Sequence, residues 1–240
     1  MRRLIPLLLL VLILLAACSS NKQVRSTDAN IAHADELFAR GKYARAAQIY
    51  DKISFERRSA STAHATFRQA ECYYNINKFS DARAKYEQFI DSFPDHEDVP
   101  SAYFRIGQCY FEESLPPQYD QDETIACIEL FQNFVQRYPN DERYPQAVEY
   151  IRKSQYKLLE KKYLNGYIYY RMKDYSAALM YFDEIIALGN IDELDRKALF
   201  YSAKLHLHQQ NRDKALASYN LLSSRYPESK EAKKLSKKFK

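Results

Sequence analysis

The chain has 240 residues, and 36 lysines and arginines against 31 aspartates and glutamates give it a formal net charge of +5. Arg2 and Arg3 fall in an N-terminal leader, and the remaining excess of +3 is too small to indicate a nucleic-acid-binding protein. Only four glycines are present, too few for a sheet-rich fold with many tight turns, whereas 21 tyrosines and 13 phenylalanines supply abundant aromatic packing.

The N-terminus has the features of an export signal. Arg2 and Arg3 precede an apolar run from Leu4 to Leu15, which is too short for a membrane span of about 20 residues. The run ends in Leu-Ala-Ala-Cys, which resembles the lipobox of bacterial lipoproteins. An ordinary secretory signal that ends in cysteine by chance is the alternative.

The lipobox implies cleavage before Cys18 and lipidation of its thiol. We therefore expect residues 1–17 to be a lipoprotein signal peptide and residues 18–27 to be the lipidated cysteine with a flexible polar tether. A serine, rather than an aspartate, follows Cys18, which resembles the pattern that sorts lipoproteins to the outer membrane.

Five short motifs repeat along the chain, each with a small residue four positions before an aromatic one. On a helix this spacing puts both side chains on one face, so the small residue admits a neighbouring helix and the ring fills the adjacent gap. The pairs are Ala46/Tyr50, Ala82/Tyr86, Cys127/Phe131, Ala178/Phe182 and Ala215/Tyr219. The motifs resemble the tetratricopeptide (TPR) repeat, whose hairpins are stable only when stacked. We predict an all-α TPR solenoid of five helical hairpins.

The motifs are unevenly spaced, and two irregularities account for this. Pro145 can begin a helix at its first position, and no proline follows before Met172, which predicts a helix of roughly 42 Å that lengthens the fourth repeat. Residues 112–122 carry two prolines and a group of acids, which predicts a loop between the two helices of the third repeat.

Neither cysteine chemistry nor catalysis is indicated. Cys72, Cys109 and Cys127 lie within apolar helical patterns, so we expect small buried hydrophobes rather than disulfide partners. The sequence contains no zinc-ligand motif, phosphate-binding loop, dinucleotide fingerprint or hydrolase nucleophile motif. We therefore predict no catalytic residue, no metal and no cofactor.

The order of these features resembles the BamD family, the outer-membrane lipoproteins of the β-barrel assembly machinery. The resemblance rests on the lipobox, the five repeats, the loop PPQYDQD at 116–122, the phrase LFQNFVQRYPND at 130–141 and the long helix. It implies a non-enzymatic scaffold, anchored by its lipid at the periplasmic face of the outer membrane. The implied partners are unfolded outer-membrane proteins, the barrel-forming subunit and other assembly lipoproteins, with no nucleic acid.

In TPR arrays the first helix of each hairpin lines a concave groove, and an aromatic groove suits an extended peptide that ends in an aromatic residue. The same rings could instead pack between neighbouring helices. When the groove pattern is placed on this sequence, it selects nine residues: Phe38, Phe67, Tyr74, Phe104, Phe111, Tyr163, Tyr167, Tyr170 and Phe200.

The long helix carries a dense positive charge, which could dock an acidic partner surface or could simply be a solvated face. The residues of this predicted docking ridge are Arg152, Lys153, Lys157, Lys161 and Lys162. We accordingly expect repeats 1–3, at residues 28–143, to bind clients. Repeats 4–5 and the basic tail, at residues 144–240, should dock partners.

The alternative functions are a periplasmic TPR scaffold that coordinates cell-wall synthesis and a secretion pilotin.

Overall fold

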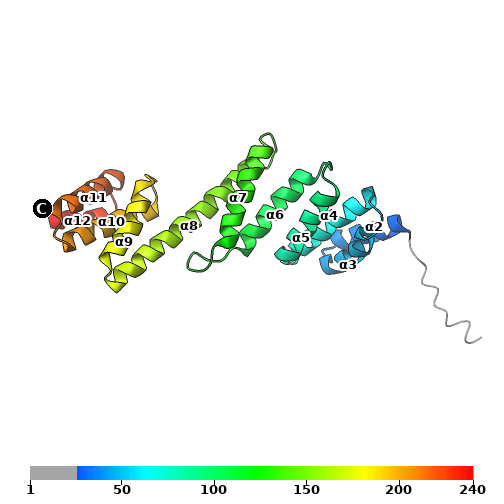
Figure 1. Cartoon of the computed structure of the whole chain (residues 1–240), viewed down its shortest axis with the longest axis horizontal. Coiled ribbons are helices and arrows are strands. Elements are labelled where there is room, and N and C mark those ends of the chain that lie inside the picture. Colours follow the sequence, from blue (N-terminus) through cyan, green and yellow to red (C-terminus); the bar gives the residue numbers. More distant parts are fainter. Residues whose placement is uncertain (1–25, 240) are drawn as a thin grey trace, which may run out of the picture. The chain divides into compact units, whose positions relative to one another are not determined.

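The computed structural model describes residues 26–239, and every regular element in that range is an α-helix (Figure 1). The predicted all-α class is confirmed. Within these residues no helix combines the length and apolar character needed to cross a membrane. The predicted signal peptide, Cys18 and nearly all of the tether lie outside the described residues. In chain order the helices are α2 (Thr27–Ala39), α3 (Tyr43–Ser54), α4 (Ala60–Asn75), α5 (Phe79–Ser92), α6 (Val99–Glu113), α7 (Asp122–Arg137), α8 (Tyr144–Met172), α9 (Tyr175–Ala187), α10 (Glu193–His208), α11 (Arg212–Arg225) and α12 (Lys230–Phe239).

The chain forms two compact units, one ending at Ile76 and the other beginning at Asn77. The first unit contains α2, α3 and α4, and the second contains α5 to α12. The boundary therefore falls inside the second predicted hairpin. The division predicted between residues 143 and 144 concerns binding partners rather than packing, and it stays a prediction.

The turns inside the hairpins share one backbone conformation. Gly41, Lys173 and Gln210 each follow the first helix of a hairpin and have φ values of 70°, 65° and 60°. A left-handed residue here ends the helix and turns the chain toward the next one. Asn77 has the same conformation, with φ of 60°, after α4. In the third hairpin the inserted loop between α6 and α7 replaces this turn.

The core of the first unit lies between α3 and its two neighbours, because α3 packs on both α2 and α4. Tyr50 and Ala46 are fully buried, as the small-to-aromatic motif predicts. Ala34 of α2 and Cys72 of α4 close the same cluster from either side. Burying an aromatic ring of this size contributes roughly 2 kcal/mol, so Tyr50 anchors the three helices.

In the second unit, helices that follow one another in the chain pack on one another from α5 to α12. The small motif residues Ala82, Cys127, Ala178 and Ala215 are all fully buried. Their helix partners include glycines at two points. A Cβ on Gly107 of α6 would lie 2.6 Å from the Phe131 ring. One on Gly166 of α8 would lie 2.9 Å from Tyr181 Cβ.

The long helix α8 runs from Tyr144 to Met172, one residue longer than the sequence predicts. Pro145 stands in its first turn. The helix packs on α7 and α9, with smaller contacts to α6 and α10. Ser154 is buried where α8 crosses α7, and its hydroxyl lies 3.5 Å from the Cys127 sulfur. The length of α8 thus allows one helix to belong to the packing of two successive hairpins.

All three cysteines among the described residues are free and buried, as predicted. Burial raises the pKa of the Cys72 and Cys109 thiols to about 12, which leaves them protonated and unreactive at neutral pH. They act as small hydrophobic residues in the helix interfaces.

The basic C-terminal segment forms a docked helix. Leu235 and Ala232 of α12 are buried against α10 and α11, and the Phe239 ring stacks on Tyr219 at 4.8 Å. This helix covers an apolar face of α10 and α11, as stacked elements of a repeat array do for their neighbours.

Candidate functional site

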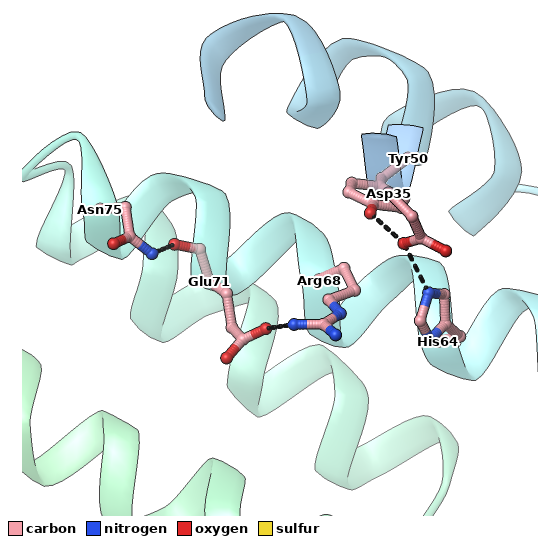
Figure 2. A network of polar contacts seen from close by, with 6 residues as sticks. All are labelled: Asp35, Tyr50, His64, Arg68, Glu71 and Asn75. Atoms are coloured by element: carbon pink, nitrogen blue, oxygen red, sulfur yellow. Dashed lines mark hydrogen bonds and ion pairs between the residues drawn. The ribbon is translucent and has the colours of Figure 1, made fainter. Parts of the chain in front are cut away.

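A network of polar side chains joins α2, α3 and α4 in the first unit (Figure 2). One carboxylate oxygen of Asp35 accepts hydrogen bonds from the Tyr50 hydroxyl at 2.5 Å and from His64 Nε2 at 2.9 Å. The three residues come one from each helix. Because Tyr50 is also the buried anchor of the core, the network fixes Asp35 and His64 on the surface formed by α2 and α4.

The same surface continues along α4 with an aromatic ring and a further ion pair. The Arg68 guanidinium lies 4.8 Å from the centre of the Phe38 ring and donates to Glu71 Oε2 at 2.6 Å. His64, Arg68, Glu71 and Asn75 follow at helical spacings of four, three and four, so they lie along one side of α4 in Figure 2. Phe38 stands one turn after Asp35 on α2. We call the residues Asp35, Phe38, His64, Arg68 and Glu71 the first-unit face.

The charge state of Asp35 is set by its neighbours. Burial by itself would raise the pKa of this carboxyl, but the hydrogen bonds from Tyr50 and His64 and the positive charge of Arg68 outweigh it and lower the pKa. Asp35 is therefore ionised throughout the physiological range. The first-unit face therefore places two carboxylates, one guanidinium and one imidazole side by side, with aromatic surface next to them.

The groove residues predicted in the first unit remain partly accessible. Phe38, Phe67 and Tyr74 are all half-buried. Phe38 packs edge-on against Tyr43 at 5.2 Å, and its face is covered by Arg68. These rings therefore combine packing within the unit with some exposed edge.

Phe104 has a different environment from the other predicted groove residues. Its side chain is 4% exposed and packs edge-on against Phe131, Phe134 and Tyr150, at centroid distances between 5.3 and 6.1 Å. This ring is a core residue of the second unit, and its removal would leave a cavity costing about 3–5 kcal/mol. Phe111 is half-buried and packs edge-on against Tyr150, with the ring centroids 4.9 Å apart.

The predicted groove residues of α8 form a row of half-buried tyrosines. Tyr163, Tyr167 and Tyr170 follow one another along the helix with ring centroids about 6 Å apart. All three contact Tyr201 of α10. Burial raises the pKa of Tyr163 and Tyr201, so these hydroxyls stay protonated. Phe200, the ninth predicted residue, is buried between α10 and α12.

The predicted docking ridge on α8 divides into two groups. Arg152 and Lys153 are exposed and share Glu149 of their own helix, Arg152 at 2.7 Å and Lys153 at 3.8 Å. Lys162 is half-exposed and pairs with Glu184 of α9 at 2.5 Å. Surface pairs of this kind contribute only about 0–1 kcal/mol, so they leave these cations available to a partner.

Lys157 and Lys161 instead bind the inserted loop at residues 114–121. Lys157 Nζ donates to the Ser114 hydroxyl at 2.5 Å, and Lys161 Nζ donates to the Tyr119 carbonyl at 2.5 Å. Burial lowers the pKa of Lys157, which also lies 5.4 Å from the Phe111 ring centre. The two lysines therefore stabilise the loop from the side of α8.

Gln121, which the sequence analysis did not single out, stabilises the same loop from within. Its side-chain amide is 5% exposed and lies within 3.3 Å of the carbonyl oxygens of Leu115, Pro116, Tyr119 and Asp120. Its own oxygen accepts a hydrogen bond from the Thr124 hydroxyl at 2.8 Å. A single glutamine carries no periodic signal, so only the folded loop reveals its role.

A buried carboxylate in the fifth hairpin was also not foreseen. Asp195 is fully buried and accepts hydrogen bonds from Arg225 and from the Tyr226 hydroxyl, both at 2.8 Å. Arg225 is the last residue of α11, and Tyr226 follows it. This arrangement joins α10 to α11 and has a structural role. No group of three or more His, Cys, Asp or Glu side chains in residues 26–239 is placed to hold a metal ion.

Comparison with known proteins gives consistent matches. The family model of the YfiO outer membrane lipoproteins matches residues 25–188, and a tetratricopeptide-repeat model matches residues 197–229. An outer membrane protein assembly factor BamD from Rickettsia prowazekii is 24% identical over 233 residues, covering 95% of this chain and 93% of that protein. A BamD from Caulobacter vibrioides is 25% identical over 159 residues, covering 64% of this chain and 52% of that protein.

Among solved structures, the TPR2AB domain of yeast Sti1 in its pHSP90 complex is similar to this chain. The TM-score is 0.48 at 15% sequence identity, over 86% of this chain and 80% of that one.

The lowered pKa of Asp35 is testable by NMR titration of the carboxyl groups. Tyr50→Phe removes one hydrogen bond to the carboxylate, so the pKa of Asp35 should rise toward 3.8. Asp141, whose pKa is lowered by hydrogen bonds from Arg143, is the internal reference and should not change. Because the folded pKa lies below the unfolded one, Asp35 stabilises the fold above about pH 4 and loses this contribution as the pH falls through the folded pKa. Its side chain is 41% exposed, so the contribution should stay under about 1 kcal/mol. An unchanged Asp35 pKa in the variant would contradict the network.

The lysine contacts to the inserted loop are testable by hydrogen exchange. The double variant Lys157→Met and Lys161→Met keeps helix propensity but removes both ammonium groups, so amides of residues 114–121 and the first turn of α7 should exchange faster. The melting temperature should fall by only a few degrees, because the helix core is untouched. Lys153→Met on the same helix is the matched control and should exchange like the unaltered protein. Equal loop protection in all three proteins would show that the lysines do not stabilise the loop.

Proposed function

The chain belongs to the YfiO (BamD-type) family of outer membrane lipoproteins, and we propose that it is a non-enzymatic scaffold in outer membrane protein assembly. In this role it binds unfolded barrel proteins through its first unit and docks the barrel-forming subunit through α8. The lipid on Cys18 holds it at the periplasmic face of the outer membrane. Other assembly lipoproteins are further partners.

The first-unit face is the observation that supports client binding. It combines the half-buried Phe38 ring with fixed polar groups of both signs, and the half-buried Phe67 immediately precedes Arg68 on α4. An extended barrel segment alternates apolar and polar side chains, and such a peptide needs both kinds of contact at close intervals. Arg68 uses one of its N–H groups on Glu71 and is 37% exposed, so further donors can reach a peptide carbonyl or carboxylate.

Docking of the barrel-forming subunit is proposed for the exposed part of the α8 ridge. Arg152 and Lys162 line a cavity of about 640 Å³ together with Tyr156, Leu158 and the α9–α10 segment. Leu188 of that segment is 58% exposed at the same place. Cations beside an exposed aliphatic side chain favour a partner surface with acids around an apolar centre. Lys157 and Lys161 are excluded from this proposal because they bind the inserted loop.

Client binding can be tested with a fluorescent peptide copied from the C-terminal segment of a barrel protein. The double variant Phe38→Ala and Phe67→Ala should weaken binding about 10-fold or more, since each ring removed from a binding surface costs about 1 kcal/mol. Phe104 is not used, because its loss would damage the core. Phe55→Ala, in the same unit and 75% exposed, is the matched control and should bind normally. A folded double variant with unchanged affinity would overturn the proposed client surface.

The docking proposal can be tested by affinity purification from gently solubilised outer membranes. Arg152→Glu with Lys153→Glu should reduce recovery of the barrel-forming subunit, and moderate salt should do the same to the unaltered protein. Arg212→Glu with Lys214→Glu, which reverses two exposed charges on α11, is the control. Recovery of peptidoglycan synthases instead would favour the cell-wall scaffold, and recovery of a secretion pore would favour the pilotin.

A further inference from the structure

A second cavity lies in the second unit between α10 and α12. It has a volume of about 400 Å³ and is separate from the docking ridge on α8. Phe200 and Leu207 of α10 and Leu235 of α12 form its apolar floor. Leu235 is 3% exposed, so α12 holds this floor firmly in place.

Cations surround the apolar floor. Lys204 Nζ lies 5.4 Å from the centre of the Phe200 ring, and Lys234 Nζ lies 5.8 Å from the same ring centre. Lys238 follows Lys234 by one turn of α12, and His208 closes the rim on α10. No acidic side chain lines this cavity.

The ammonium groups at this rim are only slightly neutralised within the protein. Lys204 donates to the Tyr170 hydroxyl at 2.8 Å, which occupies one of its three N–H groups and leaves its charge unpaired. Within residues 26–239, Lys234 and Lys238 make no hydrogen bond or ion pair, and both are exposed. By contrast, Lys233 on the same helix pairs with Glu228 at 2.8 Å. The cavity therefore carries about three uncompensated positive charges beside an apolar floor.

We propose that the α10–α12 cavity binds an acidic peptide segment of a partner protein, with one bulky apolar side chain of the peptide on Phe200 and flanking carboxylates on Lys204, Lys234 and Lys238. Charge complementarity selects an anionic ligand. The recessed apolar floor selects a ligand that can insert a side chain between two helices, which a peptide can do and a flat array of lipid headgroups cannot. Lysine rather than arginine at the rim suits point contacts with several carboxylates in variable positions.

This inference does not rest on the proposed client surface or on the docking ridge. The cavity uses neither the residues of the first-unit face nor the cations Arg152, Lys153 and Lys162. It also differs from the ridge in chemistry, because the ridge cations each have an acidic neighbour on the protein.

The test is fluorescence anisotropy with the full mature chain and a labelled peptide of alternating glutamate and aspartate around one central phenylalanine. Lys234→Gln with Lys238→Gln should weaken binding about 10-fold, and raising the salt from about 0.05 M to about 0.3 M should weaken it further. Lys230→Gln with Lys237→Gln, which removes two exposed charges of α12 outside the cavity, is the matched control and should bind within about twofold of the unaltered protein. Replacing the central phenylalanine of the peptide by serine should also lower affinity severalfold. Circular dichroism establishes that each variant is folded.

Three outcomes would overturn the proposal. The first is no binding of the acidic peptide, and the second is equal binding of the phenylalanine and serine peptides, which would indicate general charge attraction. The third uses vesicles of phosphatidylcholine with phosphatidylglycerol as the probe. In this outcome the unaltered protein binds these vesicles and the variant Lys234→Gln with Lys238→Gln does not, while both bind the peptide equally. That result would assign the lysines to a lipid surface.

Discussion

The structure depends on the close approach of helices at positions where the side chain is small. Ala46, Ala82, Cys127, Ala178 and Ala215 are fully buried, one in the second helix of each hairpin. At Gly107 even a methyl group would come within 2.6 Å of the Phe131 ring, which itself stacks on Tyr150 at 4.9 Å. The small residue and the ring are thus complementary parts of one contact. Because close-packed interiors cannot absorb an extra carbon without shifting neighbours, each contact also fixes the angle at which the next helix is presented.

The packing of the long helix α8 obeys the same constraint, because α8 makes two close helix contacts at small residues along its length. Its first half packs on α7, where Ser154 meets Cys127, and its second half packs on α9, where Gly166 meets Tyr181 and Phe182. The basic side chains of α8 fall into two groups with different contacts. Lys157 and Lys161 stabilise a loop that contains two prolines and has no helix of its own, whereas Arg152 and Lys153 stay at the surface. The basic residues form one run in the sequence, but in the folded protein they form two groups with different roles.

Sequence patterns predicted the helices well and the side-chain environments only in part. Pro145 and the small-to-aromatic pairs each act over one or two helical turns, so their effect can be inferred locally. The environment of Phe104 could not be inferred in this way, because Phe131, Phe134 and Tyr150 reach it from two other helices. Gln121 escaped notice for a related reason, since its role depends on four carbonyl groups that only the folded loop brings together.

The two binding surfaces proposed at the ends of the chain differ in electrostatic character, and this difference has a functional consequence. On the first-unit face, the carboxylates of Asp35 and Glu71 lie beside His64 and the Arg68 guanidinium, so attraction there comes mainly from Phe38, from the nearby Phe67 and from hydrogen bonds to the peptide. At the α10–α12 cavity the three lysines face no acid, so attraction there is electrostatic and sensitive to salt. A barrel segment of mixed character and an acidic segment of a partner therefore have little reason to compete for the same surface. A scaffold that holds a client and a partner at once requires this kind of separation, and different ligand chemistries provide it.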